Sequence, residues 1–79
     1  MEIKILGTGC PKCKALEKTT IEAIENLGVD AEVDKVEDIM KIMEYGILRT
    51  PGLVINEKVV SSGRSLSIKE VEGLIQQNQ

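Results

Sequence analysis

A long segment with the periodicity of an α-helix lies between two strand-like segments near the N-terminus, and this order restricts the folds open to the chain. Residues 2–6, EIKIL, place Ile3 and Ile5 on one face of a strand. Residues 29–36, VDAEVDKV, predict a second strand, because positions 29–34 alternate between apolar and acidic side chains, as a half-buried strand does. Between them, side chains suited to a core recur at steps of three and four, on one helical face: Cys13, Leu16, Thr20, Ala23, Ile24 and Leu27. A helix that joins two strands of one sheet predicts a parallel pair with a right-handed crossover.

The first helix has a start and a stop signal. Pro11 suits the first helical position, where its missing N–H leaves no bond unmade. Gly28 suits the left-handed conformation that ends many helices. Residues 37–45 predict a second, short helix that ends at Gly46, with an inward stripe formed by Ile39, Ile42 and Met43.

The C-terminal half predicts a hairpin and a capped helix. Residues 52–55, GLVI, and 58–61, KVVS, flank a tight turn at Asn56 and Glu57. Ser67 and Glu70 form the pattern of a capping box, in which side chain and backbone satisfy each other at a helix start. Leu66 and Val71 are spaced for the accompanying hydrophobic staple, and the inward face continues through Leu74 and Ile75.

The predicted order is therefore β-α-β-α-β-β-α. We expect an α/β protein with a mixed four-stranded sheet and helices on both faces, folded as a single domain over residues 1–79. Because the chain has no Trp or Phe, and Tyr45 is its one aromatic residue, the core must be built from aliphatic side chains.

The same features exclude several classes of function. A net charge of −3 without stacking aromatics argues against nucleic-acid binding. No apolar run approaches the roughly 20 residues that span a bilayer, and the N-terminus does not resemble a signal peptide. We expect a cytoplasmic monomer without a membrane segment.

Cys10 and Cys13 are the chain's two cysteines, and it has no histidine. A disulfide between them closes a very short loop, which constrains the unfolded chain least, and structural disulfides are rare in the cytoplasm. Zinc needs two further ligands, which without histidine must come from carboxylates or a second chain. A redox role therefore fits the pair better than a structural one.

The position of the pair predicts different tasks for its two thiols. Cys10 lies at the N-terminal end of the first predicted helix, where unpaired N–H groups and the macrodipole favour an anion. We expect its pKa to fall below the usual thiol value of about 8.5, with a small contribution from Lys12 and Lys14. Cys13 lies one turn later on the inward face, where burial keeps a thiol neutral. Cys10 then attacks a partner's disulfide, and Cys13 resolves the mixed disulfide.

This setting resembles the thioredoxin/glutaredoxin superfamily. A Cys-x-x-Cys pair opens the helix of a β-α-β unit, and YGILRTPGLVI, residues 45–55, is similar to the thioredoxin segment that leads into a cis-proline. The resemblance implies a thioredoxin-like fold with a cis Pro51 beside the cysteines, and a backbone at Thr50 that hydrogen-bonds the partner's extended chain. The Cys-Pro-Lys-Cys motif resembles glutaredoxins, and the length resembles the short archaeal and bacterial glutaredoxin-like redox-active disulfide proteins.

Some positions differ from the family pattern. Gly9 stands where thioredoxins carry Trp before the first cysteine, and Lys12 replaces the aromatic residue of many glutaredoxins. The segment VSSGRSLS resembles the glycine-rich turn that holds glutathione in glutaredoxins, but the acidic pair usual there is absent. These departures favour a protein disulfide over glutathione as the substrate.

We therefore predict a thiol–disulfide oxidoreductase for protein disulfides, with catalytic Cys10 and Cys13 and substrate-binding Thr50 and Pro51. We expect no cofactor and no metal. The expected electron donor is a reductase such as thioredoxin reductase, with glutathione or another low-molecular-weight thiol as the alternative.

Two other functions remain open from the sequence. A Cu(I) carrier can hold the ion between two thiolates, but small copper-chaperone-like domains run β-α-β-β-α-β and end in a strand. A binding module that keeps the thioredoxin fold without turnover differs from the enzyme only in its kinetics.

Overall fold

The computed structural model describes residues 1–9, 11–47, 49–64 and 66–78. Its elements follow the predicted order: β1 (Glu2–Leu6), α1 (Pro11–Leu27), β2 (Glu32–Val36), α2 (Ile39–Glu44), β3 (Gly52–Ile55), β4 (Lys58–Ser62) and α3 (Ile68–Gln77). Within the described ranges, no helix is both long and apolar enough to cross a membrane.

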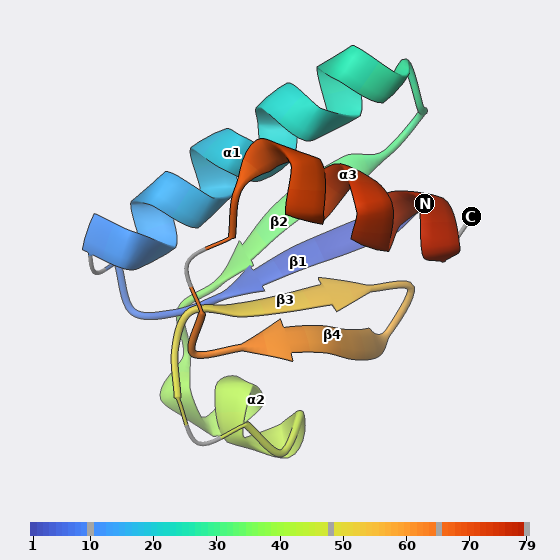
Figure 1. Ribbon diagram of the computed structural model, residues 1–79. Coiled ribbons are helices and arrows are strands. Elements are labelled where there is room, and N and C mark those ends of the chain that lie inside the picture. The colour runs from blue at the N-terminus through green and yellow to red at the C-terminus, as the bar shows by residue number, and fades with distance from the viewer. Residues whose placement is uncertain (10, 48, 65, 79) are drawn as a thin grey trace.

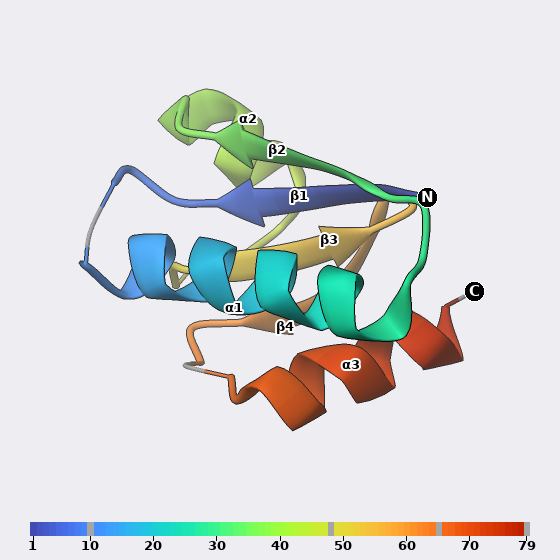
Figure 2. The same ribbon diagram turned by 90° about the horizontal axis from the view of Figure 1, so that it is seen from above.

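The four strands form one mixed sheet in the order β2-β1-β3-β4. β1 pairs parallel with β2, and β3 pairs antiparallel with both β1 and β4, which confirms the predicted parallel pair and the predicted hairpin. Helices α1 and α3 lie together on one face of the sheet, and α2 lies on the other (Figures 1 and 2). The sheet is therefore covered on both faces, as predicted.

Each face of the sheet has its own apolar cluster. Alternate residues of a strand point to opposite faces of the sheet. Ile3 and Ile5 of β1 therefore pack on the face covered by α1 and α3, while Leu6 packs on the face covered by α2. The larger cluster contains the predicted inward residues of α1 and α3, among them Leu16, Ala23, Val71 and Ile75. The smaller cluster is formed by Leu6, Ile42, Ile47 and Val54.

Side chains cap the N-terminal ends of α3 and α2. In α3 the Ser67 side chain accepts from the Glu70 N–H at 3.2 Å, and the Glu70 carboxylate accepts from the Ser67 N–H at 3.1 Å, which confirms the capping box. These bonds hold the pKa of Glu70 below its usual value. In α2 the N-cap is Asp38, whose carboxylate accepts from the Met40 N–H at 2.9 Å.

Two predictions for the middle of the chain were wrong in detail. The second strand begins at Glu32 and not at residue 29, although Val29 and Ala31 still pack against the larger cluster. In α2 only Ile42 is buried, whereas Ile39 is 61% exposed and Met43 is 64% exposed. Because α2 has six residues, less than two turns at 3.6 residues per turn, one position suffices to cover the small cluster beneath it.

Candidate functional site

Cys13 lies in the first turn of α1, which begins at Pro11. Its side chain is 5% exposed, which confirms its predicted inward position, and it is in a disulfide bond. Its sulfur therefore does not titrate in this state. Cys10, the other cysteine of the sequence, lies outside the described residues.

The segment before β3 carries the predicted substrate-binding residues. The Thr50–Pro51 peptide bond is cis, as the resemblance implied. Pro51 is buried and accepts a hydrogen bond from the Gly63 N–H at 2.8 Å, while Thr50 is exposed. Gly52 pairs with Leu6 at the end of β1, so the Thr50–Pro51 bond is anchored beside the loop that leads to the cysteines.

Gly7 is the point where these two segments meet. It is buried, and its N–H donates to the Val36 carbonyl at 2.9 Å. A Cβ atom at this position would overlap Cys13 Sγ and would lie 3.1 Å from Cys13 Cβ and 3.9 Å from Thr50 Cβ. The structure therefore brings Cys13 and Thr50 together across residue 7, although they lie far apart in the sequence.

Two hollows border the loop between β1 and α1. One has a volume of about 270 Å³, and its lining residues are Ile5, Gly7, Gly9, Cys13, Lys14, Lys35 and Glu37. The other, of about 340 Å³, is predominantly apolar and lies between the loop and α2; its lining residues are Thr8, Ile39, Ile42, Met43, Ile47 and Thr50. We call this second space the α2 hollow.

Sequence reasoning missed the α2 hollow. It assigned Ile39 and Met43 to the core, because apolar residues in a short helix are usually inward-facing. The available signal was the number of apolar residues in α2, since Ile39, Met40, Ile42 and Met43 exceed what one face of six residues can bury.

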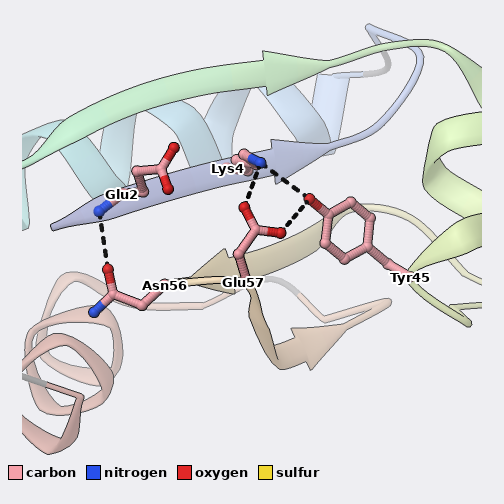
Figure 3. A network of polar contacts seen from close by, with 5 residues as sticks. All are labelled: Glu2, Lys4, Tyr45, Asn56 and Glu57. Atoms are coloured by element: carbon pink, nitrogen blue, oxygen red, sulfur yellow. Dashed lines mark hydrogen bonds and ion pairs between the residues drawn. The ribbon is translucent and has the colours of Figure 1, made fainter.

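A polar cluster connects α2 to the β-hairpin on the same face of the sheet (Figure 3). Lys4 Nζ contacts Glu57 Oε1 at 2.7 Å and donates to Tyr45 Oη at 3.1 Å, and the Tyr45 hydroxyl donates to Glu57 Oε2 at 3.2 Å. The hydrogen bonds to Glu57 and Tyr45 raise the pKa of Lys4 above its usual range. The bonds from Lys4 and Tyr45 lower the pKa of Glu57. Tyr45, the C-cap residue of α2, thus links that helix to β1 and to the turn of the hairpin.

The described part of the chain does not gather three or more Cys, Asp or Glu side chains into a metal site. A sulfur in a disulfide is also not the thiolate that a soft metal ion requires. The chemistry that the described residues support is therefore that of a buried half-cystine next to an exposed Thr and a cis-proline.

Comparison with known proteins agrees with this geometry. A family model described as a thioredoxin domain matches residues 1–76. The chain belongs to the thioredoxin family. A thioredoxin from Methanothermobacter thermautotrophicus is 39% identical over 75 residues, covering 95% of this chain and 97% of that protein. A thioredoxin from Methanocaldococcus jannaschii is 40% identical over 70 residues, covering 89% of this chain and 80% of that protein.

A solved structure extends the similarity to the fold. Thioredoxin 1 from the thermophilic eubacterium Thermosipho africanus TCF52B superposes with a TM-score of 0.65 at 26% identity, covering 98% of this chain and 92% of that chain. The thioredoxin family, the thioredoxin fold and the order ending in α3 separate this chain from the copper-carrier alternative. This thioredoxin-family chain is a thiol–disulfide oxidoreductase.

Proposed function

We propose that this chain reduces protein disulfides through its Cys-Pro-Lys-Cys motif, with Cys10 as the nucleophile and Cys13 as the resolving thiol. Thr50 and the cis Pro51 form the edge that binds the partner's extended chain. The observation that carries the proposal is the meeting of Cys13 and Thr50 at Gly7, where a single added carbon would contact both side chains.

The proposed reaction has two exchange steps. The Cys10 thiolate attacks one sulfur of the partner's disulfide, so that a Cys10–partner bond forms and the partner's other sulfur leaves as a thiolate, which takes up a proton. Cys13 then loses its proton and attacks the Cys10 sulfur. The Cys10–Cys13 bond forms, the mixed disulfide breaks, and the second partner sulfur leaves and is protonated. Two electrons and two protons pass to the partner, and this chain is left oxidised.

The α2 hollow supports a protein as the partner. It joins the Thr50 edge to the apolar residues Ile39 and Met43, which are more than half exposed. A side chain next to the attacked half-cystine would bury apolar surface there, and such burial favours association. Glutathione is a small, charged peptide, and the acidic pair that holds it in glutaredoxins is absent from residues 60–67.

Thioredoxin reductase is the proposed electron donor, and glutathione or another low-molecular-weight thiol is the competing donor. An insulin-reduction assay separates them when turnover is driven by thioredoxin reductase with NADPH and, in parallel, by glutathione. We expect turnover with the reductase to exceed turnover with glutathione.

Trapping the intermediate tests the assignment of the two cysteines. The Cys13→Ser variant cannot resolve the mixed disulfide, so it should accumulate a covalent adduct with insulin. Dithiothreitol should release the insulin by reducing that mixed disulfide. The Cys10→Ser variant is the matched control and should form little adduct, since Cys13 is 5% exposed. Mass spectrometry of the adducts identifies the linked cysteine. Equal trapping by both variants would show that the roles are assigned wrongly.

A further inference from the structure

Gly7 occupies a position where the backbone alone does not require glycine. Its φ lies outside the positive range, unlike the φ of +85° at Gly9. The residue is buried at the end of β1 and is held there by the hydrogen bond to Val36. What excludes a side chain at position 7 is the sulfur of Cys13, which occupies the space of a Cβ atom, with Cys13 Cβ only 3.1 Å from it.

We propose that Gly7 is a positioning residue for the resolving cysteine. By lacking a side chain, it lets Cys13 Sγ lie directly against the backbone of the loop between β1 and α1, and this contact fixes where the sulfur stands when it attacks. The inference rests on the proposed resolving role of Cys13, but the contact itself does not depend on that role.

A methyl group at position 7 would force the sulfur to move. Nonbonded heavy atoms stand roughly 3.5–4.0 Å apart, so Sγ would shift by about 1 Å or more. The hollow of about 270 Å³ is lined by both Gly7 and Cys13, so it offers space for a displaced sulfur. Because a misplacement of about 1 Å can slow a positioned reaction by about 100-fold, we expect the Gly7→Ala variant to resolve mixed disulfides about 10- to 100-fold more slowly. Attack by Cys10 should keep its rate, since that step does not use Cys13.

The same contact should act differently on the two redox states. In the disulfide, Cys13 Sγ is tethered and cannot turn away from residue 7. In the dithiol, the side chain can adopt another staggered rotamer. The methyl group therefore disfavours the disulfide more than the dithiol. We expect the equilibrium with glutathione to shift about tenfold toward the dithiol, which for a two-electron couple is about 30 mV.

The test compares three variants in their full-length form. Gly7→Ala carries the predicted defect. Gly73→Ala is the matched control, since this glycine lies in α3 and a Cβ there meets no atom within 4 Å. Val71→Ala controls for lost stability alone, because Val71 is fully buried against the larger cluster and lines neither hollow at the loop between β1 and α1.

The measurements are the resolution rate by rapid acid quench and mass spectrometry, and the redox equilibrium in glutathione buffers. The rate of Cys10 attack is measured separately in the Cys13→Ser background, with and without Gly7→Ala. Slower resolution and a shifted equilibrium in Gly7→Ala alone support the inference. Wild-type values in that variant, or the same changes in Val71→Ala, would overturn it.

A stability cycle covers the case in which Gly7→Ala does not fold. Under reducing conditions, Gly7→Ala should cost less stability in a Cys13→Ala background, where the sulfur is absent, than in the wild type. A double variant that is equally destabilised would show that the sulfur contact is not what excludes a side chain. Failure of the Cys13→Ser variant to trap insulin would instead contradict the proposed function. The stability cycle would still show whether the Cys13 sulfur excludes a side chain at position 7.

Discussion

Met43 allows a direct test of whether the α2 hollow binds partner proteins. Its side chain lines the hollow together with Thr50 and is 64% exposed. Fully burying a methionine side chain stabilises by about 1.5–3 kcal/mol. About two thirds of that surface is still exposed, so its burial under a partner would contribute about 1–2 kcal/mol, which corresponds to about 5- to 30-fold in affinity or kcat/KM.

The Met43→Gln variant removes this contribution with little other change. Glutamine is unbranched, of similar length, and comparable to methionine in helix propensity. Because about one third of the Met43 side chain is covered in the fold, the free energy of unfolding should fall by at most about 1 kcal/mol. We expect kcat/KM for insulin reduction to fall about 5- to 30-fold. Reduction of the small aromatic disulfide dithiobis(nitrobenzoic acid) should change by less than about twofold, because a small substrate cannot cover α2.

Ile21→Gln is the matched control. Ile21 is also an exposed apolar residue, at 42%, but it lies on α1 outside the lining of the α2 hollow. The Ile21→Gln variant should leave kcat/KM for insulin reduction unchanged. If Met43→Gln reduces insulin at the wild-type rate, or loses activity equally with the small disulfide, then the hollow does not bind the partner and the argument from exposure is wrong.

Two further predictions concern ionisation. Lys4 and Tyr45 hold the pKa of Glu57 below its usual value, so the charged carboxylate stabilises the fold above the unfolded pKa of about 4.3, and this contribution is lost as pH falls through the lower folded pKa. Urea unfolding of Glu57→Gln should therefore show a smaller loss of stability between pH 7 and pH 3 than the wild type; an equal loss would contradict the assignment. For the reduced protein, thiolate absorbance near 240 nm should reveal one cysteine, absent in Cys10→Ser, that titrates below about 8.5, whereas two ordinary titrations would refute activation of Cys10.

The sequence by itself determined the order of elements and most of their inward faces. The period of α1, the capping box at Ser67 and the stop at Gly28 depend on residues within a turn or two of each other, and such patterns can be read without knowing the fold. The Cys-x-x-Cys pair and the Thr-Pro segment were also visible as motifs. Their likeness to one family then implied the cis bond at Pro51, which the structure confirms.

Only the tertiary structure decided how much of α2 is covered and what surrounds Cys13. Ile39 and Met43 have the same local pattern as buried residues, and their exposure follows from the small area of sheet that α2 covers. The contact of Cys13 with Gly7 and the cluster of Lys4, Tyr45 and Glu57 join residues from separate elements. Such contacts depend on strand register and on the depth at which helices pack, and these are set by the whole core rather than by near neighbours in the chain.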